Sequence, residues 1–428
     1  MDNKQLPKVL IFEHPPIYKH GIGKTLYSFF YEWNRERLGQ VYSVDLPVDE
    51  SLCQYYYISE TGKATANEKE DRIKRESKRS SKLFRLMADF AHSDFGVLIR
   101  NAKYNQMIRK CKGLRTWIGE FAPECIFYGI GEIADENQYV LTLAKELRIP
   151  LIIYISDDYL TKWKNKKKYS GYINKLSKTY VECMKYSSLV VVISEKMEKL
   201  YKTEFPDCNY LVASNSAECK RHMLSHKKQT GNVINFSYTG NLGFGRGEML
   251  AEFAKAIERY NSGNGITLTL SICSQERPAE DLLNRLTNKY STYKGNVVGG
   301  ELDEERLKSD VLLLVESFDE QYKSILSTAL STKVPEYLSY GRLIMAWAPH
   351  YAWSLDYLKK NEAAYCITNE LVEPDLERFV ELFKQSKLDK TITNGNVLFD
   401  ERHEFFANAH RFSKAVDDSV NCFSGENN

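Results

Sequence analysis

Two segments in the second half of the sequence combine glycines with charged side chains in a way that suits an anionic ligand. The first, YTGNLGFGRGE (238–248), carries Gly240, Asn241 and Arg246 within seven residues. Glycines let backbone N–H groups approach a phosphate closely, and a guanidinium can donate paired hydrogen bonds to it. We therefore predict that this segment binds a diphosphate group.

The second segment, STKVPEYLSYG (331–341), places Lys333, Glu336 and Tyr337 at the start of a predicted helix. A lysine and a carboxylate on adjacent turns suit a nucleotide, with Lys333 bound to phosphate and Glu336 to the ribose hydroxyls. The alternative is an exposed ion pair between residues i and i+3, which contributes only about 0.2–0.5 kcal/mol. Taken alone, the segment favours the ion pair.

A third segment, HGIGKT (20–25), follows a predicted strand, and its Gly21, Gly23 and Lys24 are of the types that approach a phosphate. A P-loop needs a glycine five residues before Gly23, but Tyr18 stands there, so this motif is excluded. No third glycine completes a G-x-G-x-x-G pattern either. Two alternatives remain: contact with a ligand at the carboxyl end of the strand, or a simple tight turn.

Two adjacent carboxylates, Asp157 and Asp158, follow the apolar run PLIIYIS (150–156). At the carboxyl end of a buried strand they could act as a base or orient a substrate hydroxyl. Either could instead cap the following helix, a frequent role of Asp, and the two roles could fall to different members of the pair. No further carboxylates adjoin them with metal-ligand spacing, so we expect no metal site.

Short apolar runs alternate with helix-length segments, as is typical of parallel sheets covered by helices on both faces. The predicted strands of the first half are 8–12, 40–46, 124–130, 150–156 and 188–194, and its first helix is 25–37. The predicted strands of the second half are 232–240, 266–274, 296–300, 310–317, 342–349 and about 363–368, and its helices include 247–261, 279–290, 302–310 and 333–341.

The pattern restarts after Gly231, which indicates two doubly wound units. We predict an α/β protein with an N-terminal domain over 1–220 and a C-terminal domain over 221–400. A last helix at about 400–425 is expected to pack back on the first domain.

The composition narrows the possible partners and the compartment. A formal net charge of +2 over 428 residues shows no basic excess of the kind that nucleic-acid binders carry. No apolar run reaches the roughly 18 residues that a membrane span needs. The nine cysteines are scattered without C-x-x-C spacing, so we expect reduced thiols in a cytoplasmic protein and no zinc site.

Two charge-dense segments have competing interpretations. Residues 63–85 are rich in Lys and Arg and predict a solvated helix or loop, with a binding arm as the alternative. The segment YLTKWKNKKKYSGYINK (159–175) mixes lysines with Trp163 and tyrosines. A basic aromatic helix of this kind could rest on anionic lipid at the inner face of the membrane, whereas the alternative is a solvated helix face.

Four segments, taken in their order along the chain, resemble the glycosyltransferase family 4-like enzymes of GT-B fold. They are 188–205, 238–248, 296–317 and 331–349. Transferases of bacterial polysaccharide and capsule synthesis are the subgroup they resemble most. The resemblance implies two Rossmann-like domains that face each other across a cleft, with the nucleotide-sugar donor on the C-terminal domain and the acceptor mostly on the N-terminal one. It also implies retention of anomeric configuration, without a metal or other cofactor.

The resemblance implies roles for particular residues. Gly240 and Asn241 match the loop near the donor diphosphate, and Arg246 and Lys333 match the two cations that neutralise it. Glu336 matches the second glutamate of an E-x₇-E element that binds the nucleotide ribose.

The first glutamate of that element is missing, because Thr328 stands eight positions before Glu336. Glu316 or Glu320 could replace it. The Asp157–Asp158 pair occupies the place of a loop that faces the donor sugar, so the resemblance favours a catalytic role for one of them.

The function predicted from the sequence is transfer of a sugar from a UDP- or GDP-sugar to a glycan or lipid-linked acceptor in surface polysaccharide synthesis. The missing glutamate leaves a non-catalytic GT-B scaffold as one alternative. A GT-B enzyme of other chemistry, such as a nucleotide-sugar epimerase or a phosphorylase, is the other.

Overall fold

The computed structural model describes residues 5–12, 16–17, 23–43, 48–58, 93–111, 113–164, 166–223, 231–263 and 265–426. The charge-dense segment 63–85 therefore lies outside the described residues. Backbone contacts divide the chain into two compact units. Unit 1 combines Met1–Ala213 with Asn408–Asn428, and unit 2 is Ser214–Ala407. Unit 2 is one continuous stretch of chain, whereas unit 1 also includes the last helix.

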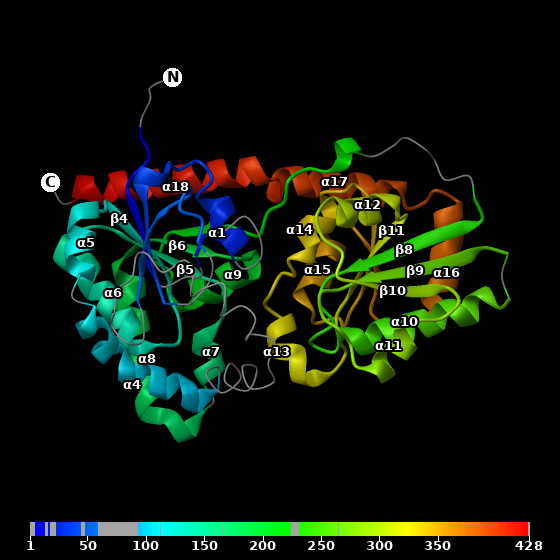
Figure 1. Cartoon of the computed structure of the whole chain (residues 1–428), viewed down its shortest axis with the longest axis horizontal. Helices are drawn as coiled ribbons and strands as arrows, with labels where there is room; N and C mark the ends of the chain where they lie inside the picture. Colours follow the sequence, from blue (N-terminus) through cyan, green and yellow to red (C-terminus); the bar gives the residue numbers. More distant parts are fainter. Residues whose placement is uncertain are drawn as a thin grey trace. The chain divides into compact units, whose positions relative to one another are not determined.

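Unit 1 is built on a seven-stranded sheet in which all neighbouring strands are parallel, in the order β3-β2-β1-β4-β5-β6-β7. Figure 1 labels three of these strands, β4, β5 and β6. Its strands are β1 (Val9–Phe12), β2 (Leu38–Tyr42), β3 (Gln54–Tyr57), β4 (Cys125–Gly129), β5 (Leu151–Ile155), β6 (Ser187–Val192) and β7 (Tyr210–Val212). Its described α-helices are α1 (Lys24–Phe29), α4 (Asp94–Lys110), α5 (Leu114–Phe121), α6 (Ala134–Leu147), α7 (Tyr159–Lys164), α8 (Ser170–Tyr186), α9 (Glu195–Glu204) and, from residue 408 on, α18 (Phe405–Glu426).

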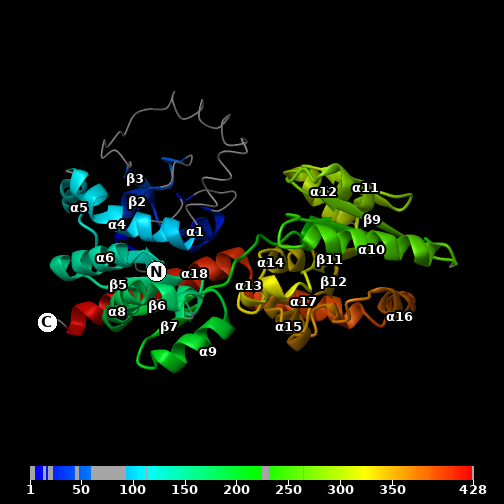
Figure 2. The same cartoon turned by 90° about the horizontal axis from the view of Figure 1, so that it is seen from below.

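Unit 2 repeats the plan with a six-stranded parallel sheet in the order β10-β9-β8-β11-β12-β13. Its strands are β8 (Val233–Thr239), β9 (Thr267–Cys273), β10 (Ser291–Gly295), β11 (Val311–Val315), β12 (Leu343–Trp347) and β13 (Tyr365–Ile367). Besides the first residues of α18, its described α-helices are α10 (Arg246–Asn261), α11 (Glu280–Leu286), α12 (Gly300–Lys308), α13 (Lys323–Leu326), α14 (Lys333–Leu338), α15 (Trp353–Lys360), α16 (Glu373–Lys384) and α17 (Asp389–Arg402). Helices α10 and α11 lie side by side in both views (Figures 1 and 2).

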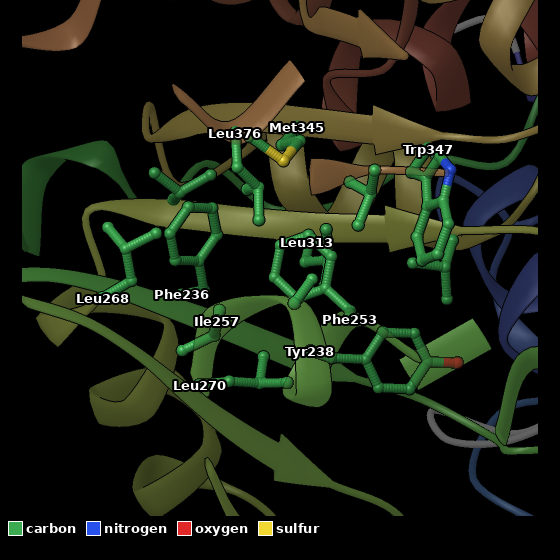
Figure 3. Packing of buried hydrophobic residues seen from close by; sticks show 14 of the residues in the cluster. Phe236, Tyr238, Phe253, Ile257, Leu268, Leu270, Leu313, Met345, Trp347 and Leu376 are labelled. Carbon is green, nitrogen blue, oxygen red and sulfur yellow. The ribbon is translucent and has the colours of Figure 1, made fainter. Parts of the chain in front are cut away.

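Side chains alternate between the two faces of the sheet along each strand, and in unit 2 both faces are buried. Leu313 of β11 belongs to one hydrophobic cluster, and its neighbours Leu312 and Leu314 belong to another on the opposite face. Figure 3 shows Leu313 in the first cluster, with Phe236 and Trp347 on either side of it. Two buried faces explain why the strands appear in the sequence as continuous apolar runs.

The last helix, α18, completes one core of unit 1. The Phe412 ring stacks on Phe29 with centroids 4.8 Å apart, and it meets Phe30 and Phe127 edge-on. Val416, one turn further, is fully buried in the same cluster. The end of the chain is therefore an integral part of unit 1.

The strand predicted at 296–300 is wrong. β10 occupies Ser291–Gly295 instead, and α12 begins at Gly300. β10 is an edge strand with alternating exposed residues, so no apolar run marks it, whereas the apolar Val298 is 55% exposed. The helix predicted at 279–290 is also too long, because the backbone is already extended at Thr287.

The helix predicted at 25–37 is divided in two. Helix α1 ends at Phe29, and a separate 3-10 turn spans Arg35–Arg37. Asn34 between them has an extended backbone, a conformation that short polar side chains favour over the helix interior. No helix in the described part of the chain has the length and apolar character needed to cross a bilayer.

Candidate functional site

The predicted diphosphate-binding residues converge at the carboxyl ends of two neighbouring strands of unit 2. β8 ends at Thr239 and leads into the Gly240–Gly245 turn, and β11 ends just before Glu316. Lys333 is the first residue of α14. In open parallel sheets this edge is where ligands bind, so the topology brings together residues far apart in the sequence.

Arg246 is a nearly buried cation held by two partners. Its Nε donates a hydrogen bond to Glu316 Oε2 at 2.8 Å, and its Nη1 donates one to Asn241 Oδ1 at 2.7 Å. Arg246 is 9% exposed and Glu316 only 2%. A buried carboxylate needs such a partner, so Glu316 fixes the orientation of the guanidinium.

Lys333 is a buried cation that has no such partner among the residues that the structure describes. It is 6% exposed, and within the part of the chain that the structure describes its ammonium forms no hydrogen bond or ion pair. Its Nζ lies 5.3 Å from the centre of the Tyr238 ring. Burial, with the Arg246 guanidinium adding to it, lowers the pKa of Lys333 to about 8. An ammonium in this position gains strongly from an anion.

The side chain of Lys333 passes directly over Gly240. A Cβ atom at position 240 would lie 2.1 Å from Lys333 Cε, so any other residue there would push the lysine side chain out of this position. Tyr337 holds the same strand end from the core: its buried hydroxyl accepts a hydrogen bond from Thr239 N at 2.9 Å and donates one to Thr239 O at 3.2 Å. Tyr337 therefore supports the turn through the backbone.

The glycine-rich turn presents backbone donors as well. Phe244 and Gly245 have left-handed φ values of 56° and 74°, and a Cβ at position 245 would lie 2.5 Å from Ser317 Oγ. Among the described residues, the N–H groups of Gly243, Phe244 and Gly245 have no acceptor, whereas Leu242 N–H donates to Glu276 at 3.1 Å. They immediately precede α10, whose N-terminal end favours an anion.

Glu336 lies one turn after Lys333 on α14 and is partly exposed. Its Oε2 accepts a hydrogen bond from Arg306 Nη2 at 3.0 Å. Arg306 is a site residue that the sequence pattern does not predict, because α12 carries many charges and nothing distinguishes this one. Only the packing of α12 against β8, which the sequence does not reveal, would have marked Arg306 as a site residue.

The two glutamates that could replace the missing first glutamate are in different environments. Glu316 lies in the cluster beside Arg246, as described above. Glu320 begins an exposed 3-10 turn and pairs with Lys323 at 2.9 Å. Thr328, at the position of the missing glutamate, hydrogen-bonds to the Ser324 carbonyl oxygen at 3.4 Å. Of the two, only Glu316 contacts a predicted diphosphate-binding residue.

The predicted catalytic carboxylates belong to unit 1 and have different environments. Asp158 Oδ1 accepts a hydrogen bond from Thr161 N at 3.1 Å, which is the contact of a helix cap, and another from the Tyr201 hydroxyl at 3.2 Å. Asp157 is exposed, with Ser156 Oγ 3.1 Å away as its nearest donor. Asp158 therefore takes the capping role, and Asp157 is the member of the pair open to a substrate.

The first glycine segment is described only in part. Gly23 stands at the N-terminal boundary of α1 and Lys24 is its first residue, whereas Gly21 lies outside the described residues. Helix α1 has only six residues, so its end alone makes no ligand site.

The lysine-rich segment 159–175 is anchored inside unit 1. Trp163 is buried and donates from Nε1 to Glu132 Oε2 at 3.1 Å, and Lys162 pairs with the same oxygen at 2.6 Å. Lys166 and Lys175 are also paired, with Asp94 and Asp135 respectively. Trp163, the tryptophan of this segment, is thus part of the core.

Solved structures align with nearly the whole chain. A trehalose 6-phosphate synthase from Burkholderia multivorans matches with a TM-score of 0.61 and 10% identity, over 99% of this chain and 99% of its own. HepE from Anabaena, solved in complex with UDP and glucose, matches with a TM-score of 0.55 and 11% identity over 96% and 99%. The fold is GT-B. A sucrose-phosphate synthase from Thermosynechococcus elongatus also matches, with a TM-score of 0.54 and 10% identity, over 95% of this chain and 97% of its own.

At these identities the similarity concerns the GT-B fold alone. No protein-family model matches the sequence, and no curated protein does either. Within the described residues, no group of three or more His, Cys, Asp or Glu side chains is placed to hold a metal ion.

Proposed function

We propose that this protein is a glycosyltransferase whose donor, a UDP- or GDP-sugar, binds in unit 2. The observation that carries the proposal is the buried ammonium of Lys333 beside the Gly240 turn, which has no hydrogen-bond or ion-pair partner among the described residues. Arg246 forms an ion pair with Glu316, and Arg306 forms one with Glu336. Lys333 forms no ion pair among the described residues. A diphosphate placed against Lys333 and the N–H groups of the turn supplies the missing negative charge.

The same groups suit the chemistry of transfer. As the bond between the sugar and the diphosphate breaks, negative charge grows on the leaving phosphate, and fixed positive charge there lowers the barrier. Lys333, Arg246 and the start of α10 supply that charge, so the reaction needs no metal ion for this purpose. The leaving phosphate then accepts the proton of the acceptor hydroxyl, and the sugar is transferred with retention.

The acceptor side of the proposal rests on the sequence. The four segments that resemble family 4-like transferases support a glycan or lipid-linked acceptor in surface polysaccharide synthesis. Asp157 is the exposed carboxylate at the carboxyl end of β5 and is proposed to orient the acceptor or donor sugar. Peripheral membrane contact through 159–175 stays a prediction, which flotation with anionic vesicles at low and high salt tests.

Binding and turnover are tested in two steps. Isothermal titration with UDP and GDP shows whether the site takes a nucleotide, and incubation with UDP-, GDP- and ADP-sugars shows whether a sugar is released or transferred. Lys333→Ala should abolish both signals. Lys323→Ala is the matched control, because Lys323 lies in the same unit but is exposed and paired with Glu320.

Each alternative has its own outcome. Nucleotide binding without turnover of any donor would favour a non-catalytic GT-B protein. Conversion of the donor sugar to its epimer would favour the epimerase. Absence of all nucleotide binding, or full activity of Lys333→Ala, would refute the proposed donor site.

A further inference from the structure

Arg306 is a buried arginine that reaches three parts of the candidate site. Its side chain is 9% exposed and projects from α12. The guanidinium donates from Nε to Thr239 Oγ1 at 2.9 Å, from Nη1 to the Tyr340 hydroxyl at 3.3 Å and from Nη2 to Glu336 Oε2 at 3.0 Å. One side chain thus connects the end of β8, through Thr239, with α14, through Glu336, and with Tyr340 just after α14.

The partners of Arg306 are themselves fixed. Thr239 is held by the buried Tyr337 hydroxyl and immediately precedes Gly240. The Tyr340 hydroxyl also donates to Asp303, a second residue of α12. Because a guanidinium is a planar fork with donors in fixed directions, these contacts leave it a single orientation.

This orientation determines where the Glu336 carboxylate lies. A guanidinium buried to this degree requires a negative partner, and Glu336 provides it at 3.0 Å. Glu336 is thus the acidic member of an ion pair, and a carboxylate in that role only accepts hydrogen bonds. That is the property needed to bind the two hydroxyls of a ribose.

We propose that Arg306 is a positioning residue for nucleotide selectivity: it holds the Glu336 carboxylate where it accepts the 2′- and 3′-hydroxyls of the donor ribose. The inference rests on the proposed function, since it places a nucleotide in this site. Through Thr239, the same guanidinium holds the strand end that leads into the Gly240 turn. Arg306 therefore links the carboxylate proposed to bind the ribose with the turn proposed to bind the diphosphate.

The test compares a ribonucleotide with its deoxy analogue. UDP or GDP, whichever binds the wild type more tightly, is titrated beside its 2′,3′-dideoxy form and inorganic pyrophosphate. The wild type should prefer the ribonucleotide by about tenfold or more, the effect of hydrogen bonds to a charged acceptor. In Arg306→Met the preference should fall close to one while pyrophosphate still binds. Arg306→Lys, which keeps the charge but loses the fork, should lie between them.

Two further variants separate positioning from general damage. Arg342→Met is the matched control, because Arg342 is also partly buried and donates to α12, at the Leu307 carbonyl, but not to Glu336. It should keep the wild-type preference. Glu336→Gln should lose the preference, and adding Arg306→Met to it should cause no further loss, since both changes remove one interaction.

The outcomes distinguish this inference from the proposed function. A wild type that binds no nucleotide would refute both. A wild type that binds UDP or GDP but not in preference to the dideoxy form would overturn the inference alone, as would a folded Arg306 variant with an unchanged preference. Unfolding temperature and pyrophosphate binding establish that each variant is folded. If Arg306→Met does not fold, the preference of Arg306→Lys decides, and it must fall below that of the wild type.

Discussion

Replacing Lys333 with methionine should stabilise the ligand-free protein. Burial lowers the pKa of this lysine from its ordinary 10.5 to about 8, a difference of roughly 2.5 pKa units. Each unit corresponds to about 1.4 kcal/mol, so holding the charged form in the folded protein costs about 3 kcal/mol at pH 7. Methionine has a similar length, fills the same space and removes that cost.

The effect has a defined pH dependence. Between pH 8 and 10.5 the unfolded chain still binds the Lys333 proton while the folded protein has released it. The unfolded state then binds more protons, so the free energy of unfolding of the wild type should rise with pH across this window. Lys333→Met should lack this part of the rise and should equal the wild type near pH 10.5.

Denaturant unfolding at pH 7, 8, 9 and 10 measures both effects. The comparison uses the transition that UDP or GDP shifts, since that transition reports on unit 2. Lys323→Met, an exposed change in the same unit, should alter stability by no more than about 0.5 kcal/mol. The nucleotide should stabilise the wild type by about 2.7 kcal/mol at one hundred times its Kd, and it should have little effect on Lys333→Met. A Lys333→Met variant that is less stable than the wild type at pH 7 would refute the reasoning.

Gly240→Ala should abolish nucleotide binding, because its Cβ would meet Lys333 Cε at 2.1 Å; titration with UDP and GDP measures this, and unchanged affinity would contradict it. Arg246→Met leaves Glu316 buried without its cation and should destabilise unit 2 by about 3–5 kcal/mol, whereas the double change with Glu316→Leu should recover much of the loss in denaturant unfolding. Asp158→Ala removes a helix cap and should cost about 0.5–2 kcal/mol without abolishing turnover, so an inactive but stable variant would assign catalysis to Asp158.

The sequence predicts the general fold well because both sheets are buried on two faces. Continuous runs such as the one at 310–317 mark central strands, which must be apolar throughout. Three of the four described edge strands lack that signal, whereas β13, the fourth, was predicted at about 363–368. β3, β7 and β10 are short and only partly buried, and the pattern of apolar runs misses the first two and misplaces the third.

The candidate site is predictable only where one segment supplies several of its groups. The Gly240 turn was recognisable because glycines, Asn241 and Arg246 cluster locally, whereas Lys333 was assigned to the diphosphate through the family resemblance. The ion pair of Arg246 with Glu316 joins residues 70 positions apart, and nothing in either segment marks the other. Arg306 is a harder case, since its burial follows only from the packing of α12 against β8.

The last helix has a consequence for how the protein is made. Synthesis of unit 2 is complete at residue 407, when unit 1 still lacks residues 408–428. Until these residues emerge, Phe29, Phe30 and Phe127 have no Phe412 to cover them, although they were synthesised first. The core of the nascent N-terminal unit therefore stays incomplete until the segment that carries Phe412 and Val416 has emerged.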